Sequence, residues 1–299
     1  MGNPLQIVYG FFDTGSSLSW FKCNQPTEKA GFYYFNQTQS ASYRIVRCSD
    51  QQKCNTKKQY IKGCDKTDGC IFDITYSGGD WATGYLCANN NEYSLPRQLN
   101  ADDPKFSYCI SSDLSQINVL LFGPESRIQG QPVKMFRNFN NDNYFIELLA
   151  ITVNNERLDV PPSVFQMSDS GTRGFIIDSG TTSTWLTSVA FEAMKKKMVQ
   201  LFGPPVQYKY FEICYESRKF VDGRPPVIRF EFENYLLEIE ESNIWYKIPS
   251  STLQCLIILN RQNNTISILG NQPLLDFNVG YDPNKGLLHF DKIKCPTPF

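Results

Sequence analysis

Two short segments of the sequence, about 165 positions apart, place an aspartate before a small hydroxyl residue and a glycine. Residues 11–20 read FFDTGSSLSW and residues 176–185 read IIDSGTTSTW. A bare Asp-Thr/Ser-Gly triplet is expected by chance in roughly one chain of this length in ten, whereas two copies of the longer pattern are not. The candidate reactive groups are therefore the carboxyl groups of Asp13 and Asp178.

Two carboxyl groups held a few ångströms apart do not easily both ionise, so the pair keeps one proton over a broad acidic range. The ionised member takes a proton from water and the protonated member donates to a carbonyl oxygen, which together drive direct attack of water on an amide. Their titration belongs to the pair. The alternative is that each Asp merely caps a turn, where Asp is common; the repeat favours the pair.

Each copy predicts a buried strand that ends in a tight turn, since Phe-Phe and Ile-Ile favour strands and Gly15 and Gly180 permit unusual backbone geometry. The repeat predicts two related lobes, residues 1–137 and 138–299, whose symmetric pairing brings both strand ends to one interface. The remaining pattern is mainly β, with strand-like runs at 143–153, 227–239, 253–259 and 265–269.

One helix is predicted over residues 188–201, where Val189, Met194, Met198 and Leu201 recur at helical spacing before Gly203. Lys195 to Lys197 then form its solvated side. We therefore expect a mainly β, bilobal protein with few helices.

Composition excludes several other classes of function. Net charge is −1 with charges scattered along the chain, which predicts no nucleic-acid partner, and no apolar run approaches the roughly 18 residues of a membrane span. The single histidine, His289, lies in a strand-like run and is expected to be structural. Ser-His-Asp, Cys-His and histidine-rich zinc sites therefore have no properly placed imidazole.

The ten cysteines are an even number that favours disulfides and an oxidising compartment. Four of them, Cys48, Cys54, Cys64 and Cys70, lie close together without the C-x-x-C spacing of common zinc sites. Sequons begin at Asn36 and Asn263, although no signal peptide is visible at the N-terminus.

These turns and three further segments resemble the pepsin-like aspartic proteases, and more closely their cysteine-rich plant, nepenthesin-like branch. The further segments are CIFDITYSGGDWATGYL (70–86), KFSYCI (105–110) and ILGNQPLLDFNVGYD (268–282). The last looks like the apolar-apolar-Gly element of the second lobe. The resemblance runs nearly end to end and implies an acid-protease fold and an endopeptidase active at acid pH. Such an enzyme binds an extended polypeptide between its lobes, as a monomer without cofactor or metal, outside the cell or in the vacuole.

The resemblance also implies roles for individual residues. Asp13 and Asp178 are the catalytic pair, and Ser16 and Thr181 are the hydroxyl residues that hydrogen-bond them from outside. The residues that support the pair are Thr14, Gly15, Ser16, Ser179, Gly180 and Thr181.

Two aromatic residues and the cysteines complete the implied set. Tyr76 corresponds to the tyrosine of the flap that closes over substrate and Trp20 to its hydrogen-bonding partner, with ordinary aromatic packing as the alternative. The implied disulfides are Cys48–Cys70, Cys54–Cys64, Cys109–Cys295, Cys214–Cys255 and Cys23–Cys87.

The sequence also departs from this family. Only twelve residues precede Asp13, where relatives have an extra strand, so we expect a clipped start. Between Gly84 and Phe106 a long strand-rich stretch is missing, including the first lobe's own apolar-apolar-Gly element, and the flap reads Tyr-Ser-Gly-Gly-Asp instead of Tyr-Gly-Asp-Gly-Ser. Loss of the element that crosses beneath the first turn would leave Asp13 badly positioned.

Two alternatives follow. A catalytically silent, pepsin-like protein that binds another enzyme is favoured by the shortened lobe and opposed by the two intact Asp turns. A glycosidase also uses paired carboxylates, but the repeated Asp-Gly turn and the flap-like hairpin do not indicate a sugar site.

Overall fold

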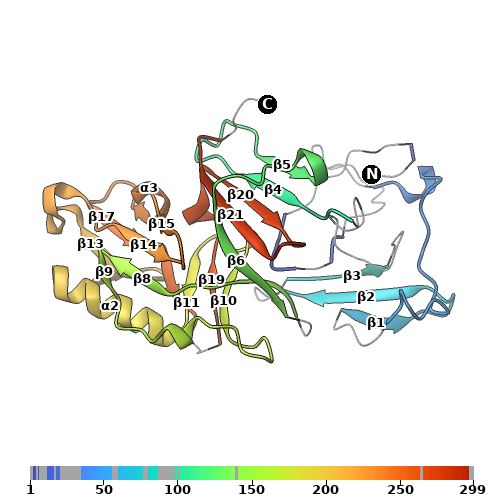
Figure 1. Cartoon of the computed structure of the whole chain (residues 1–299), viewed down its shortest axis with the longest axis horizontal. Helices are drawn as coiled ribbons and strands as arrows, with labels where there is room; N and C mark the ends of the chain where they lie inside the picture. Colours follow the sequence, from blue (N-terminus) through green and yellow to red (C-terminus); the bar gives the residue numbers. More distant parts are fainter. Residues whose placement is uncertain are drawn as a thin grey trace. The chain divides into compact units, whose positions relative to one another are not determined.

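The computed structural model describes residues 3–4, 6, 12–16, 18–20, 35–55, 60–76, 80–86, 96, 99, 102–138, 141–262 and 265–295 (Figure 1). The chain divides into two compact units. One consists of Met1–Phe11 and Leu18–Asp102, and the other of Phe12–Ser17 and Asp103–Phe299. We call them the first and second unit. The short segment that carries Asp13 therefore belongs to the unit that carries Asp178.

This division differs from the lobes predicted at 1–137 and 138–299. Residues 103–137 join the second unit because their strands pair with strands from the C-terminal end of the chain. Strand β4 (Phe106–Cys109), for example, runs antiparallel to β20 (Phe277–Asp282), with Tyr108 opposite Val279.

The first unit contains a three-stranded antiparallel sheet of β1 (Ile61–Cys64), β2 (Cys70–Thr75) and β3 (Trp81–Tyr85). A short 3-10 helix, η1, covers Gln37–Gln39. Strands β2 and β3 form a hairpin in which Thr75 lies opposite Trp81. Phe72 and Ala82 point into a small core with Leu18, Val46, Tyr60 and Leu86.

The second unit is built around a ten-stranded sheet in the order β18-β11-β19-β10-β7-β6-β21-β20-β4-β5. Besides β4 and β20, its strands are β5 (Val119–Phe122), β6 (Gln131–Asn138), β7 (Asn141–Ile146), β10 (Gly174–Ile177), β11 (Thr184–Leu186), β18 (Ile258–Asn260), β19 (Ile266–Leu269) and β21 (Leu287–Lys292). Strands β10 and β19 run parallel, and both end at the site described below.

Two four-stranded sheets and two helices complete the second unit. The strands are β8 (Ala150–Val153), β9 (Glu156–Arg157), β14 (Ile228–Glu231) and β15 (Leu236–Glu238) in one sheet, and β12 (Val206–Tyr208), β13 (Phe211–Glu216), β16 (Trp245–Lys247) and β17 (Leu253–Leu256) in the other. The helices are α2 (Ser188–Phe202) and α3 (Glu241–Ile244), and short 3-10 helices are η2 (Gly123–Glu125), η3 (Pro162–Val164), η4 (Ser217–Lys219), η5 (Val221–Gly223) and η6 (Gln272–Leu274).

The mainly β fold and the strand-like runs predicted from sequence are confirmed. The predicted helix is also confirmed as α2, which ends at Gly203 with a φ of 77°. Its buried face differs from the prediction. Met194 and Met198 are buried as expected, but Ala190 and Phe191 complete the buried face, while Val189 and Leu201 are exposed.

No helix in the described ranges has the length and apolar character needed to cross a membrane.

Candidate active site

The second aspartate turn begins where strand β10 ends. The Asp178 backbone N–H donates to the carbonyl of Leu269, 3.0 Å away, which continues the parallel pairing with β19. The Gly180 N–H donates to Asp178 Oδ1 at 2.8 Å, and the Thr181 hydroxyl donates to Asp178 Oδ2 at 2.6 Å. Both oxygens of this carboxylate therefore have a donor from its own turn.

The chain that follows β19 passes directly beneath this turn. A Cβ on Gly270 would lie 2.3 Å from the Ser183 carbonyl oxygen, so only glycine allows this approach. The next residue, Asn271, donates from its backbone N–H to Thr181 O at 2.8 Å and from its side-chain amide to Ser179 O at 2.7 Å. The Gly270 element is visible in the sequence, whereas the role of Asn271 was not predicted, because its only signal is its place after that glycine.

The first aspartate turn, described over residues 12–16, is held by different contacts. The Phe12 ring packs edge-on against Tyr108, with centroids 5.3 Å apart, and against Phe106. The Gly15 N–H lies 2.9 Å from Asp13 Oδ1 and 3.2 Å from Asp178 Oδ1. One backbone donor thus serves both carboxyl groups, which brings the two predicted catalytic side chains together.

A reciprocal pair of hydrogen bonds joins the two turns. The Thr14 N–H donates to Ser179 Oγ at 3.0 Å, and the Ser179 N–H donates to Thr14 Oγ1 at 2.9 Å. The Ser179 hydroxyl also donates to the Phe12 carbonyl at 3.0 Å. Thr14 and Ser179 are both buried, so these bonds are shielded from water. This symmetric link is what the twofold sequence repeat predicts.

The Asp178 carboxyl group lies close enough to Asp13 to alter the ionisation of Asp13. Burial, the charge of Asp178 and a hydrogen bond with the Asp178 side chain raise the pKa of Asp13 to about 7, partly opposed by the Gly15 N–H. A Cβ on Gly180 would lie 2.4 Å from Asp13 Oδ1, and a Cβ on Gly15 would lie 2.6 Å from the Asp178 carboxyl carbon. Glycine at both positions therefore makes the approach possible.

The two implied outer hydroxyls do not behave alike. Thr181 hydrogen-bonds Asp178 as the resemblance implies. The Ser16 hydroxyl is buried and has no hydrogen-bond partner among the described residues, so its implied bond to Asp13 is absent. The first turn thus reproduces the second in sequence without reproducing its full hydrogen bonding.

Two buried tyrosines near the turns were not predicted. Tyr108 and Tyr281 are fully buried beside Phe106, whose ring stacks on Tyr281 with centroids 4.2 Å apart. Burial raises the pKa of both phenols, and the charge of Asp178 adds to the shift at Tyr108. In the sequence, Tyr108 stands out only as part of the family-like segment KFSYCI (105–110). Apolar, aromatic surroundings of this kind disfavour charge on the groups that they enclose.

In the first unit, Trp20 and Tyr76 form the hydrogen bond that the resemblance implies. The indole N–H of Trp20 donates to the Tyr76 hydroxyl at 2.6 Å. Tyr76 directly follows β2, and its backbone N–H donates to Asp80 O at 2.8 Å. The contact is more specific than general aromatic packing, while the role of Tyr76 as a flap residue stays a prediction.

The disulfides confirm two implied pairs and correct two others. Cys109–Cys295 and Cys214–Cys255 are bonded as expected. Within the four-cysteine cluster the implied pairs Cys48–Cys70 and Cys54–Cys64 are wrong, because Cys48 bonds Cys64 and Cys54 bonds Cys70. All four lie within one small region, so neither spacing nor distance along the chain distinguishes the pairings. The Cys23–Cys87 pair lies outside the described residues.

His289 lies in β21 opposite Gly280 and is partly buried, which lowers its pKa. Asn36, the first sequon residue, uses its side-chain oxygen to accept from the Thr38 N–H at 3.1 Å, so it caps η1. The second sequon, at Asn263, lies outside the described residues.

Comparison with known proteins agrees with this fold. Residues 1–90 match the family described as "Xylanase inhibitor N-terminal" and residues 143–292 match "Xylanase inhibitor C-terminal". The chain belongs to the plant pepsin-like aspartic protease family. It is similar to aspartic proteinases nepenthesin-2 and nepenthesin-1 of Nepenthes gracilis, each 27% identical over 99% of this chain and 76% of the relative.

Solved structures show the same fold at lower identity. Conglutin gamma, a basic 7S globulin from lupine seeds, superposes with a TM-score of 0.73 at 18% identity. The match covers 98% of this chain and 90% of the conglutin chain. The structure of EDGP has a TM-score of 0.70 at 17% identity, covering 94% and 87%. These likenesses establish the bilobal, sheet-rich architecture.

The comparisons also bear on the predicted gap. The alignment with nepenthesin-2 runs over 348 positions, more than the 299 residues of this chain, so the relative carries residues that this chain lacks. The two family matches leave residues 91–142 uncovered, and this stretch includes much of the segment between Gly84 and Phe106.

Proposed function

We propose that this protein is an aspartic endopeptidase in which Asp13 and Asp178 activate a water molecule for direct attack on a peptide bond. The observation that carries the proposal is the shared Gly15 N–H, which lies within hydrogen-bonding distance of one oxygen from each carboxyl group. The proposal is supported by relatives that are named aspartic proteinases.

The surroundings of the two carboxyl groups divide the roles. Asp178 accepts hydrogen bonds from Gly15, Gly180 and Thr181, and such donors stabilise a charged carboxylate. Asp13 accepts from Gly15 alone among backbone donors of the described residues, and its pKa is raised to about 7. We therefore assign the proton to Asp13 and the negative charge to Asp178 in the resting pair.

Catalysis follows from this division. Asp178 removes a proton from the attacking water while Asp13 donates its proton to the carbonyl oxygen, so that a tetrahedral intermediate forms without separated charge. The proton on Asp178 then passes to the amide nitrogen as the C–N bond breaks, and Asp13 recovers a proton from the intermediate's hydroxyl. The substrate is an extended polypeptide, and no cofactor takes part in any step. Activity is lost as the pH rises through about 7, because Asp13 then loses its proton.

The test is cleavage of a denatured protein at acid pH by the purified chain and by Asp178→Asn. We expect the wild-type chain to cleave and the variant to lose at least about 1,000-fold in rate, since one member of the pair can no longer act as a base. Circular dichroism should show that the variant is folded. Full activity in a folded Asp178→Asn variant would remove the pair from the mechanism.

A second candidate is a catalytically inactive, pepsin-like protein that binds or inhibits another enzyme. Two observations favour it: both matching families are described as xylanase inhibitors, and the Ser16 hydroxyl lacks its implied bond in the first turn. A wild-type chain that stays folded at acid pH, cleaves nothing and binds a glycoside hydrolase would support this function. Cleavage abolished by Asp178→Asn would exclude it as the sole function.

The four described disulfides support an oxidising compartment. We propose that the protein works outside the cell or in the vacuole, as a monomer, and that it has neither nucleic acid nor membrane as a partner. Glycosylation at the sequons would accompany that location and is testable by the mass shift after glycosidase treatment.

A further inference from the structure

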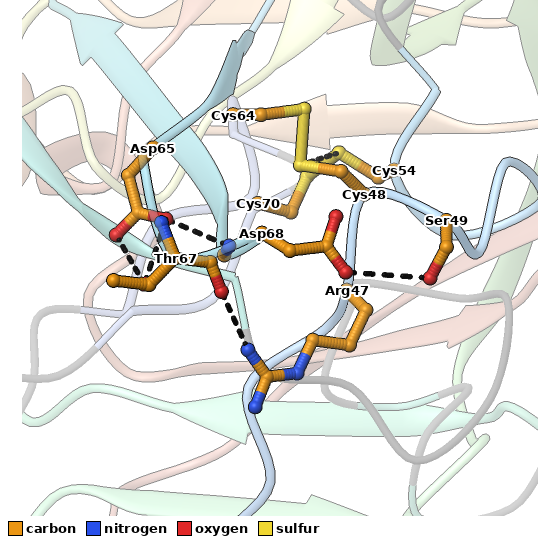
Figure 2. Close-up of a disulfide and its surroundings, with 10 residues drawn as sticks. Arg47, Cys48, Ser49, Cys54, Cys64, Asp65, Thr67, Asp68 and Cys70 are labelled. Atoms are coloured by element: carbon orange, nitrogen blue, oxygen red, sulfur yellow. Dashed lines mark hydrogen bonds between the residues drawn. A yellow bond between two sulfur atoms is a disulfide. The ribbon is translucent and has the colours of Figure 1, made fainter.

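Two disulfides of the first unit lie against each other. Cys48 bonds Cys64 and Cys54 bonds Cys70, yet Cys54 Sγ lies only 3.9 Å from Cys48 Sγ of the other disulfide (Figure 2). The sulfur atoms of Cys48, Cys54 and Cys64 all lie within 4.8 Å of one another. The two bonds therefore share one sulfur cluster, and a thiolate formed on Cys48 would be next to a disulfide sulfur.

The backbone holds these cysteines in place whichever sulfurs are bonded. Cys64 and Cys70 face each other directly across strands β1 and β2. The Cys48 N–H donates to Asp68 O at 3.0 Å, the Cys54 N–H donates to Asp50 O at 2.7 Å, and the Cys70 N–H donates to Val46 O at 2.9 Å. Breaking one sulfur–sulfur bond thus leaves the four cysteines close together.

Only part of the cluster is open to solvent. Cys64 is exposed and Cys48 is half-buried, whereas Cys54 is 8% exposed and Cys70 is fully buried. Of the four cysteines, Cys64 is therefore the most open to an external thiol, and the Cys54–Cys70 bond is the more shielded of the two disulfides. Because exchange requires a thiolate to contact a disulfide sulfur, access selects where the reaction begins.

We propose that this four-cysteine cluster is a thiol–disulfide exchange site, attacked at Cys64 by an external thiol. The thiolate bonds Cys64 Sγ and expels Cys48 as a thiolate. Cys48 then attacks Cys54 Sγ, which forms Cys48–Cys54 and expels Cys70 as a thiolate. Cys70 finally attacks Cys64 of the mixed disulfide, which forms Cys64–Cys70 and releases the external thiolate. Two disulfides become two others, with no net oxidation or reduction.

The exchange changes how the β2–β3 hairpin is tied to the rest of the first unit. Cys70 is the first residue of β2, and its carbonyl accepts from the Leu86 N–H at 2.9 Å beside the end of β3. The bond Cys54–Cys70 joins this hairpin to the loop that contains Cys54, whereas Cys64–Cys70 joins only β1 to β2. Exchange therefore frees the loop from the hairpin that leads to Tyr76.

The first experiment treats the oxidised chain with cysteamine. This monothiol is cationic, so the negative charge of Asp65, the residue after Cys64, favours its approach. Aliquots are alkylated at intervals and digested without reduction for peptide mapping. We expect a cysteamine adduct on Cys64 first, then the pairs Cys48–Cys54 and Cys64–Cys70, with Cys109–Cys295 and Cys214–Cys255 unchanged. An adduct that forms first elsewhere, or the appearance of Cys48–Cys70 with Cys54–Cys64, would overturn the route. So would exchange that occurs only after the near-ultraviolet circular dichroism of the fold is lost.

The second experiment removes the need for an external thiol. Cys64→Ser leaves Cys48 as a free thiol beside Cys54, so we expect a substantial fraction of molecules to contain Cys48–Cys54 and a free Cys70. The matched control is Cys255→Ser, which leaves Cys214 free with no further cysteine clustered near it in the described ranges; Cys214 should stay unpaired. Retention of Cys54–Cys70 in every folded Cys64→Ser molecule, or pairing of Cys48 with Cys23 or Cys87, would contradict the proposal. If Cys64→Ser does not fold, the cysteamine experiment still decides.

Discussion

The two aspartate turns share a sequence pattern but differ in what supports them. Asp178 follows strand β10, which pairs with β19, and Gly270 passes beneath its turn. The first turn, in the part of the chain described as residues 12–16, belongs to no sheet. Asp13 is instead positioned through bonds that reach it from the second turn, above all the two between Thr14 and Ser179.

The second turn therefore organises the first. The second turn needs only its own sheet to place Asp178, whereas the place of Asp13 depends on Ser179 and on the packing of Phe12 against Tyr108. This asymmetry is what the predicted loss of a supporting element between Gly84 and Phe106 would produce. Variants that disturb the second turn should therefore affect both aspartates, and variants in the first turn should affect one.

The largest effect is expected at Gly270. Gly270→Ala places a Cβ 2.3 Å from Ser183 O and 2.6 Å from Thr182 O, both backbone atoms that cannot move without displacing the Asp178 turn. We expect the free energy of unfolding to fall by about 3 kcal/mol, measured by urea denaturation. Gly84→Ala is the control, since its Cβ meets only the Phe72 ring at 3.1 Å. Equal stability of the two variants would show that the second turn does not depend on this close approach.

The next effect tests whether the first turn depends on the second. Ser179→Ala removes the acceptor of the Thr14 N–H and the donor to Phe12 O, each 3.0 Å away, and leaves a buried N–H without a partner. We expect a loss of about 2 kcal/mol in stability and at least a tenfold loss in cleavage rate, because Asp13 is displaced.

The control for that variant is Ser188→Ala, which removes a single hydroxyl bond to Asn260 at the start of α2. It should change stability by less than about 1 kcal/mol and leave cleavage unchanged. If Ser179→Ala retains wild-type cleavage, the first turn holds Asp13 without help from the second.

A third effect concerns pH and Asp13. Its pKa rises from 3.8 to about 7 on folding, so the native state binds this proton more tightly than the unfolded state. The stabilisation is complete below about pH 4 and is lost as the pH rises through about 7. Relative to Asp13→Asn, the wild-type chain should lose on the order of 1–2 kcal/mol between pH 4 and 7.5, after allowing for solvent screening at a partly exposed carboxyl. Urea denaturation of both proteins at several pH values measures this difference, and parallel curves would show that Asp13 has an ordinary pKa.

Much of this site could be predicted because it rests on local sequence signals. The repeated Asp-Thr/Ser-Gly pattern indicates two turns, and its symmetry indicates that Asp13 and Asp178 meet. The helix α2 and the Gly270 element carry equally strong patterns. Each of these features depends on residue type and spacing within a short stretch of chain.

The remaining features depend on three-dimensional detail that a local pattern does not encode. The four clustered cysteines all lie near one another, so small side-chain rotations decide which of them are bonded. The pairs implied by the family resemblance were therefore wrong. The Ser16 hydroxyl lacks a bond that its sequence position implies, because hydrogen bonding requires placement within a few tenths of an ångström. The boundary of the units follows strand pairing between β4 and β20, which lie far apart in the chain.

The smallest effect is expected from removing the hydroxyl groups of Thr181 and Ser16, and it should differ between the two. Thr181→Val removes the 2.6 Å bond to Asp178 Oδ2 at nearly constant volume, so the charged carboxylate loses a donor worth about 1 kcal/mol. The acid limb of the cleavage profile should then move to higher pH by somewhat less than about one unit. Ser16→Ala removes a buried hydroxyl with no partner in the described ranges. The acid limb of its cleavage profile should therefore stay at the wild-type pH, and its free energy of unfolding should stay within about 0.5 kcal/mol of the wild-type value. Equal shifts in the two variants would mean that Ser16 bonds Asp13 during catalysis and that the two turns are functionally symmetric.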